Sequence, residues 1–407
     1  MNLFYPVLAL SIGFIVVNIS IPAIIRVAKA KRLFDVPNER TASKKIVPTL
    51  GGVAIFVGLA MSTIIGTYKY SFDELKYLIA AIIIMFFVGL KDDILNISAK
   101  KKLCLQILAA LILILLGNFR FTNLHGILGI YEINYAASLI FSCFTIIVLI
   151  NAFNLIDGID GLASGIAMLT SATFGVWFLL SGHTEYGIMC FGFIGSLAAF
   201  FLYNVFGQSN KIFMGDTGSL ILGITMSAIV IKFNEFNINA GNSFAVASAP
   251  AISVGILIVP VIDTLRVFFI RISEGRSPFS PDMNHIHHKL LKLGYSHLKA
   301  TSIIVTANVF FIGLSWILSF VFDINSLFVL LFILGLAIGY LPSYIIKNQE
   351  KEAKLFVVFD IQRNRIEKRN IKFKPEIFTF EKDSPATKIA SFQKQTDKKS
   401  EKTSYKK

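Results

Sequence analysis

The chain has 407 residues, of which 55% are hydrophobic and 16% are charged. Soluble domains carry about 25% charged residues, so this composition excludes a soluble globular protein and predicts an all-α polytopic membrane protein. The formal net charge of +14 would suit a nucleic-acid partner in a soluble protein. In a membrane protein it indicates basic cytoplasmic loops and contact with anionic membrane lipids, with no nucleic acid.

Apolar runs long enough to cross a bilayer, at roughly 20 residues each, begin near the N-terminus. The first run lacks the flanks of a removable signal peptide, so it counts as a transmembrane helix. About eleven spans are predicted, at 3–25, 48–67, 75–91, 103–118, 135–152, 162–180, 187–206, 217–233, 244–265, 301–321 and 325–346. Together they predict a transmembrane domain over residues 1–346.

The basic residues indicate how these spans are oriented. They are concentrated in the connections at 26–47, 91–102 and 266–299, which are odd-numbered and therefore lie on one side of the membrane. The positive-inside rule places that side in the cytoplasm and the N-terminus outside.

Residues 347–407 form a strongly basic stretch after the last span, and the odd number of spans makes this stretch cytoplasmic. We expect a tail that lies near anionic headgroups and is partly disordered. Within it, alternating apolar and polar residues at 355–380 favour a short hairpin or a surface strand.

Four segments are too polar for their positions at the ends of apolar helices. They are 91–102 (KDDILNISAKKK), 151–161 (NAFNLIDGIDG), 215–219 (GDTGS) and 277–288 (SPFSPDMNHIHH). Each falls in an odd-numbered connection, so all four are predicted on the cytoplasmic face. We infer one shared site there.

Carboxylates and carboxamides dominate the first two segments. Asp92 and Asp93 are adjacent acids at a membrane boundary, and they are either a solvated helix end balanced by the following lysines or part of a site. A polar ridge along one side of a helical turn is formed by the residues that recur every three positions, Asn151, Asn154, Asp157 and Asp160. Their oxygens suit Mg²⁺, and a structural cap accounts for one of them rather than four.

Asp216 in GDTGS belongs either to a simple turn or to a metal site, because few cations stand near it in the sequence. His285, His287 and His288 follow in the fourth segment. They suggest zinc but lack a further spaced ligand. They also fit an amphipathic helix on lipid headgroups or, together with Arg276, a group of hydrogen-bond donors for phosphate.

Acidic oxygen ligands, a divalent cation and a basic loop at the lipid boundary are the requirements of phosphoryl transfer from a soluble diphosphate to a lipid acceptor. Hydrolysis of a lipid phosphate needs similar groups, and periodicity does not separate the two reactions. A secondary transporter could also use eleven helices. Transporters, however, place ionisable residues near the bilayer midplane, whereas here these residues cluster at one surface.

The motifs also resemble those of a known family. They are DDILN with KKKLCLQ, NAFNLIDGIDGLASG, GDTGSL, SPFSPDMNHIHHKL, and VPNER and PTLGG after the first helix. This set resembles the polyprenyl-phosphate N-acetylhexosamine-1-phosphate transferases of glycosyltransferase family 4, in particular the bacterial branch that starts O-antigen, enterobacterial common antigen and teichoic acid synthesis. The likeness extends over residues 1–346 and does not include the tail.

That resemblance implies a multi-pass enzyme of the bacterial cytoplasmic (inner) membrane. It would transfer a sugar 1-phosphate from a UDP-N-acetylhexosamine, expected to be UDP-N-acetylglucosamine, to undecaprenyl phosphate, giving the lipid diphosphate sugar and UMP. The implied cofactor is Mg²⁺, with Mn²⁺ as an alternative, and a homodimer is left open. Transfer of phospho-N-acetylmuramoyl-pentapeptide is the alternative within the family, but that branch has three consecutive histidines where this chain has His-Ile-His-His.

The resemblance also implies roles for single residues. Asp216 would coordinate Mg²⁺ with Asn154 beside it, and Asp92 and Asp93 would orient or deprotonate the acceptor phosphate. The implied substrate-binding residues are Asn96, Lys102, Asn151, Asp157, Asp160, Arg276, His285, His287 and His288, the last four in a loop that grips donor phosphate and selects the sugar. One departure lies in the first loop, where relatives follow Asn-x-Arg with a basic residue and a His, while this chain has Thr41 and Ser43.

Overall fold

The computed structural model describes residues 3–31, 33–35, 47–238, 241, 243–277 and 282–369, with side chains as far as residue 351 apart from Asp35. The first-loop motif VPNER, with Thr41 and Ser43, lies outside the described residues, as do 278–281 and the tail beyond 369. The chain divides into two compact units, Met1–Asn348 and Gln349–Lys407, and each is described by itself.

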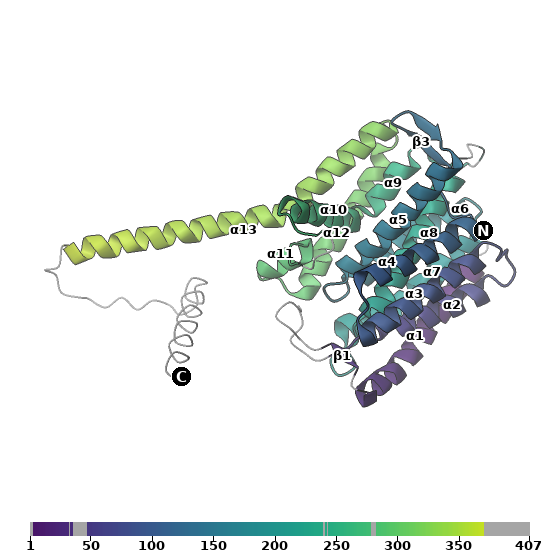
Figure 1. The fold of residues 1–407 in the computed structure, drawn as a ribbon, viewed down its shortest axis with the longest axis horizontal. Coiled ribbons are helices and arrows are strands. Elements are labelled where there is room, and N and C mark those ends of the chain that lie inside the picture. The colour runs from purple at the N-terminus through teal and green to yellow at the C-terminus, as the bar shows by residue number, and fades with distance from the viewer. Residues whose placement is uncertain are drawn as a thin grey trace. The chain divides into compact units, whose positions relative to one another are not determined.

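Helices make up most of the first unit (Figure 1). In chain order the elements are α1 (Phe4–Lys31), β1 (Phe34–Asp35), β2 (Val47–Pro48), α2 (Gly51–Gly66), α3 (Leu75–Leu95), α4 (Ala99–Leu111), the π-helical turn η1 (Ile112–Leu116), β3 (Asn123–Ile127), β4 (Ile130–Glu132), α5 (Tyr135–Ile156), α6 (Leu162–Leu180), α7 (Thr184–Phe201), the π-helical turn η2 (Leu202–Phe206), α8 (Gly215–Phe236), α9 (Ala249–Ile256), α10 (Ile258–Ser273), α11 (Ile286–Lys292), α12 (His297–Leu318) and α13 (Ile324–Arg369). Strands β1 and β2 pair antiparallel, as do β3 and β4.

Each of the eleven predicted apolar runs contains a helix, and a polytopic membrane protein is confirmed to that extent. Among the described residues, seven helices are long and apolar enough to cross a membrane, and the bent pair of α9 and α10 would make eight. Helix α2 is shorter, with 16 residues, and α3 ends in the charged residues of KDDIL. The count of eleven spans and their orientation therefore remain predictions.

Helix α8 lies at the centre of the first unit, where every residue from Thr217 to Asn234 is buried. Helices α3 and α5 pack along it (Figure 1). At the first turn of α8 the neighbouring backbones come unusually close: a Cβ atom added at Gly89 of α3 would lie 2.3 Å from the Cα of Thr217. Glycine at this contact therefore brings α3 directly against the GDTGS segment.

The ninth predicted span, 244–265, is two helices rather than one. Helices α9 and α10 meet at an angle of 78°, and Pro260 in the first turn of α10 has no N–H to donate to the carbonyl of Ile256. Asn308 of α12 instead donates its Nδ2 to this carbonyl at 3.0 Å. A side chain from a distant helix thus satisfies the backbone group that the bend leaves free.

An ion pair with a buried lysine lies at the end of α8 that is remote from GDTGS. Lys232 is 3% exposed, and its Nζ lies 2.8 Å from Oε1 of Glu74, which directly precedes α3. The same Nζ donates to the carbonyl of Asn118 at 3.2 Å, and the Tyr186 hydroxyl donates to Glu74 Oε2. The lysine is therefore neutralised and hydrogen-bonded, as a buried charge requires.

The second unit includes the continuation of α13, which runs to Arg369. The predicted hairpin or strand is therefore wrong for residues 355–369, which are helical. No Gly or Pro interrupts residues 343–374, so nothing in the local sequence ends the helix begun before them. The remainder of the predicted stretch lies outside the described residues.

Candidate active site

The carboxylate of Asp93 receives the first backbone donors of α8. Its Oδ1 accepts from the N–H of Asp216 at 2.7 Å, and its Oδ2 accepts from the N–H of Thr217 at 3.0 Å and from the Thr217 hydroxyl at 2.5 Å. These N–H groups have no partner within their own helix, and a helix N-terminus favours a negative charge. Asp93 of α3 therefore fixes the place of Asp216, which favours positioning over proton transfer for Asp93.

A second network converges on the Asp216 side chain. Lys102 Nζ lies 2.8 Å from Asp92 Oδ2 and 2.9 Å from Asp216 Oδ1. Asn154 Nδ2 also donates to Asp216 Oδ1 and, at 2.8 Å, to the hydroxyl of Ser219. One cation thus bridges two carboxylates that come from different helices, and the two acids predicted to act on acceptor and metal are joined through Lys102.

The residues at this point fit a Mg²⁺ ion. Mg²⁺ uses one or two protein oxygens together with waters and substrate phosphates, and Asp216 supplies a carboxylate that is 32% exposed. Asn154 supplies a carboxamide whose oxygen and nitrogen exchange places by rotation of one torsion. Asp92 and Asp216 share the Lys102 ammonium, and a divalent ion would relieve the remaining repulsion among the carboxylates gathered here.

Asp157 follows the last residue of α5 and belongs to the same electrostatic cluster. Loss of water around its carboxyl raises its pKa to about 8, and the charges of Asp216, Asp93 and Asp160 act in the same direction. Its carboxyl makes no hydrogen bond within the described part of the chain. Asp157 is therefore available to a ligand, and its contact with the nucleotide sugar stays a prediction.

Asp160 is bound by other groups of the protein and has a structural role. Its Oδ2 lies 2.6 Å from Lys211 Nζ and 3.0 Å from His297 Nδ1, and its carbonyl accepts from the hydroxyl of Thr301 at 2.8 Å. Although burial acts against it, the hydrogen bonds from His297 and Lys211 hold the pKa of Asp160 below its usual range. This residue joins the start of α12 to the site.

The side chains of Asn151 and Asn96 are not part of the hydrogen-bond network around Asp216. Asn151 Nδ2 donates to Gln106 Oε1 at 3.1 Å and to the carbonyl of Ile147 at 2.8 Å, so it joins α5 to α4. Asn96 ends α3 with a positive φ of 48° and turns the chain so that the N–H of Ile97 reaches Asp92 Oδ1 at 2.6 Å. Their predicted contacts with substrate remain untested.

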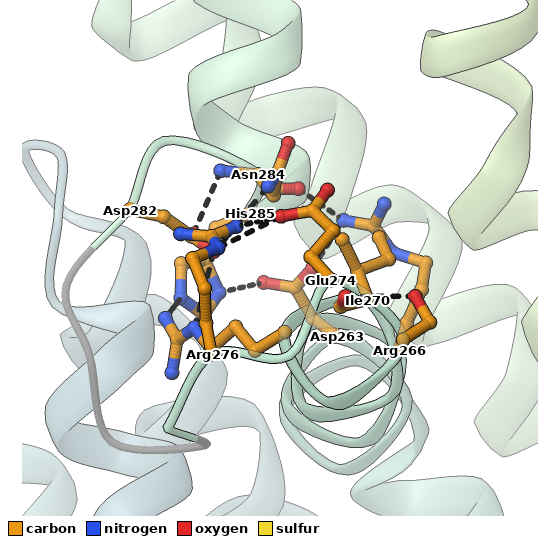
Figure 2. Close-up of polar contacts among 10 residues, drawn as sticks. Asp263, Arg266, Ile270, Glu274, Arg276, Asp282, Asn284 and His285 are labelled. Carbon is orange, nitrogen blue, oxygen red and sulfur yellow. Dashed lines mark hydrogen bonds and ion pairs between the residues drawn. The ribbon is translucent and has the colours of Figure 1, made fainter.

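The histidine segment, defined here as residues 282–288, lies against α10 (Figure 2). His285 Nδ1 is 2.9 Å from Asp263 Oδ2, and its Nε2 is 3.4 Å from Arg271 Nη2. Both ring nitrogens are thus engaged by protein groups, which disfavours the zinc interpretation. Arg276 Nε donates to Glu274 Oε2 at 2.8 Å, and Arg276 Nη2 lies 3.6 Å from Asp282.

His287 connects this segment to NAFNLIDGIDG. It is 1% exposed, and neither ring nitrogen has a hydrogen-bond partner among the described residues. A Cβ atom added at Gly158 would lie 2.1 Å from His287 Nε2, so the ring rests on the glycine that follows Asp157. Burial lowers the pKa of His287 to about 3, and its imidazole is neutral. The four polar segments predicted to share a site are therefore linked by contacts.

Comparisons with known proteins show the family to which the chain belongs. Residues 75–234 match glycosyl transferase family 4. The undecaprenyl-phosphate alpha-N-acetylglucosaminyl 1-phosphate transferase of Escherichia coli O157:H7 is 30% identical over 285 residues, which cover 69% of this chain and 75% of that protein. The chain belongs to glycosyl transferase family 4.

Two further relatives in this family match over longer stretches. The undecaprenyl-phosphate alpha-N-acetylglucosaminyl 1-phosphate transferase of Escherichia coli strain K12 is 28% identical over 345 residues, or 84% of this chain and 91% of that protein. The probable undecaprenyl-phosphate N-acetylglucosaminyl 1-phosphate transferase of Bacillus subtilis strain 168 is 29% identical over 322 residues, or 79% and 84%.

Some residues of this family 4 site escaped the sequence interpretation. Asp263 stands in the apolar run IVPVIDTLRVFF, and an acid in such a run is itself a signal of function or of a buried partner. Arg266 and Arg271 were counted as loop charges, yet each is 1% exposed. No sequence pattern around Lys211 or His297 indicated a role for them, because only the fold brings them to Asp160.

Proposed function

We propose that this family 4 chain transfers N-acetylglucosamine 1-phosphate from UDP-N-acetylglucosamine to undecaprenyl phosphate and releases UMP. The names of its relatives in Escherichia coli and Bacillus subtilis support this substrate pair. The observation that carries the proposal is the convergence on Asp216, where a carboxylate, a carboxamide and a bridging lysine meet at the end of three packed helices. Together with a divalent cation, such a group would bind the phosphates of a diphosphate donor.

In the proposed reaction an oxygen of the acceptor phosphate attacks the phosphorus that carries the sugar. The bond from this phosphorus to the oxygen bridging to the uridine-linked phosphate breaks, and UMP leaves with that oxygen. A phosphate monoester is mostly ionised at neutral pH because its second pKa is about 6, so the acceptor needs orientation rather than deprotonation. Asp92 and the Lys102 ammonium that it shares with Asp216 would orient it.

Asp216 and Asn154 would hold the Mg²⁺ ion, or Mn²⁺ in its place. Bound there, the ion would supply neutralisation of the charge that develops on the diphosphate. Asp93 keeps Asp216 at the first turn of α8 through the contacts described above. Asp157 is assigned to the nucleotide sugar, and the histidine segment with Arg276 to the donor phosphates and to the choice of sugar.

The proposed setting is the bacterial cytoplasmic membrane, with the N-terminus outside and the site on the cytoplasmic face. Basic residues in the connections that carry the polar segments support this orientation. A soluble nucleotide sugar and a membrane-bound acceptor also meet at that boundary. A homodimer is compatible with the reaction and is not required by it, since all the groups named lie on one chain.

The test uses purified full-length protein in detergent with Mg²⁺, undecaprenyl phosphate and a panel of UDP-sugars. We expect UMP release that requires both lipid acceptor and UDP-N-acetylglucosamine, and a lipid diphosphate sugar as product. Asp216→Asn keeps the shape but removes the charge and should be almost inactive, with at most partial recovery at high Mg²⁺. UMP release without acceptor would indicate hydrolysis instead, and phospho-N-acetylmuramoyl-pentapeptide transfer would support the other branch.

A further inference from the structure

Asp263 is an acid buried in the bent helix α10, with 2% of its surface exposed. Its two oxygens contact three groups. Oδ2 lies 2.9 Å from His285 Nδ1, and Oδ1 accepts from the N–H of Ile286 at 3.0 Å and from Arg266 Nη2 at 2.9 Å. The carboxylate therefore binds a side chain and a backbone group of two consecutive residues near the start of α11.

Arg266 extends this contact to the other side of His285. Its Nη2 donates to the carbonyl of Asn284 at 2.5 Å as well as to Asp263, and Figure 2 shows both α10 side chains directed toward the segment. The backbone is thus held at residues 284 and 286 by one buried ion pair. Hydrogen bonds to buried charged groups are among the stronger ones in proteins.

The three histidines consequently have different surroundings. His285 is engaged at both ring nitrogens by Asp263 and Arg271, and His287 is buried against Gly158. His288 stays partly exposed, with its ring 4.2 Å from that of His287, and makes no hydrogen bond within the described part of the chain. It is the histidine that retains both surface and hydrogen-bonding capacity for a ligand.

We propose that Asp263 is the positioning residue of the histidine segment, acting through His285 and the N–H of Ile286, and that His288 is the histidine that contacts the donor diphosphate. This inference rests on the proposed transferase function, because it assigns the segment to the donor. Without the anchor the segment samples several arrangements. The apparent affinity for the donor then falls by the fraction of time spent in the competent one, while saturating donor selects that arrangement and restores turnover.

The experiment compares Asp263→Ala, Asp263→Asn, His285→Ala and His288→Ala by donor KM, kcat and amide hydrogen exchange. Asp263→Ala should raise the donor KM about tenfold, leave kcat within about twofold, and speed exchange at Ile286. Asp263→Asn keeps an acceptor for this N–H and should lose less. The double variant Asp263→Ala/His285→Ala should be no worse than Asp263→Ala, since both act through one contact. His288→Ala should raise KM without changing exchange at Ile286.

Glu74→Gln is the control, because it removes a carboxylate that pairs with a buried cation, Lys232, in an ion pair remote from the site. It should leave the donor KM unchanged.

Three results in the Asp263 variants would overturn the proposal: a fall in kcat at constant KM, unchanged exchange at Ile286 in Asp263→Ala, or additive losses in the double variant. An unaltered KM in His288→Ala would overturn its second part. If wild-type protein releases no UMP, the proposed function fails, whereas the exchange measurement still decides whether Asp263 anchors the segment. Should Asp263→Ala not fold, Asp263→Asn provides both measurements.

Discussion

Asp92 and Asp93 are adjacent in sequence and differ in what they contact. Asp93 accepts hydrogen bonds from the first turn of α8 on both oxygens, whereas Asp92 shares Lys102 with Asp216. Nothing in the sequence indicated that the two acids would differ in this way, because the difference depends on which of them faces α8. The sequence predicted a site at this pair, and the structure separates their surroundings.

This difference predicts two kinds of damage. Asp93→Asn can accept with one oxygen where the carboxylate uses two, so α8 loses at least one hydrogen bond to a charged group, worth about 1.5–3 kcal/mol. We expect a lower melting temperature together with lower turnover. Asp92→Asn should lower turnover by about 100-fold or more while keeping most of the stability. Thermal unfolding in detergent and UMP release measure both, and equal melting temperatures for the two variants would contradict the division.

Gly158 is predicted to tolerate no side chain. A Cβ atom there would overlap His287 Nε2, and overpacking a buried contact costs about 1–3 kcal/mol. Gly158→Ala should therefore lower kcat/KM roughly tenfold, and Gly158→Ala combined with His287→Ala should be no worse than His287→Ala. Gly165→Ala is the control, since a Cβ there would meet Val305 at an ordinary 3.4 Å. Equal losses in the two glycine variants would show that the contact with His287 is not the cause.

At the scale of single elements, we expect the docking of α11, meaning its packing against Gly158 through His287, to depend on pH. Burial lowers the pKa of this histidine to about 3, and a free histidine has a pKa of about 6.5. Between these values the undocked helix binds more protons than the docked one. Docking is therefore fully stable above pH 6.5 and weakens as the pH falls, by up to about 1.4 kcal/mol per pH unit.

We expect amide exchange in α11, corrected for its intrinsic rate, to become faster from pH 7.5 to pH 5.5. His287→Asn removes the titrating group and should flatten this profile. If that variant keeps the wild-type dependence, the effect belongs to another group, and His288, whose pKa burial also lowers, is the first alternative.

Hydropathy predicted where the helices lie but not how they are interrupted. The break between α9 and α10 depends on Asn308, which is about fifty positions away in sequence and satisfies the carbonyl of Ile256. Pro260 alone was compatible with a modest kink. The strand predicted in the tail was wrong for a different reason. The prediction relied on alternation over a few residues and gave too little weight to the absence of any Gly or Pro between 343 and 374.

At the scale of the whole molecule, the orientation of the spans is testable by cysteine labelling in a variant without the three natural cysteines. A cysteine placed near Asn123 or Asn239 should react with an impermeant reagent from outside. One placed near Asn96, Asp157 or His287 should react only after the membrane is opened, because the positive-inside rule puts those connections in the cytoplasm. Labelling of any of the latter from outside would contradict the proposed orientation.

Much of the candidate site could be predicted from the sequence because the residues proposed as ligands occur in compact motifs. Asn154 and Asp216 were each recognisable as oxygen ligands, and one donates a hydrogen bond to the other in the structure. Asp263, Lys211 and His297 act through partners far away in sequence, so local pattern could not pair them. The residues that hold the candidate site together were therefore harder to predict than those proposed to face the substrates.

The ion pair of Glu74 and Lys232 has a consequence for biosynthesis. During translation Glu74 emerges from the ribosome well before Lys232, so the anion is already at the membrane when the lysine of α8 has to be integrated. A charged residue in an apolar helix disfavours insertion by about 2.5–3.5 kcal/mol when it has no partner. Loss of Glu74 should thus reduce the amount of protein that accumulates in the membrane, while each molecule that does assemble keeps its normal turnover.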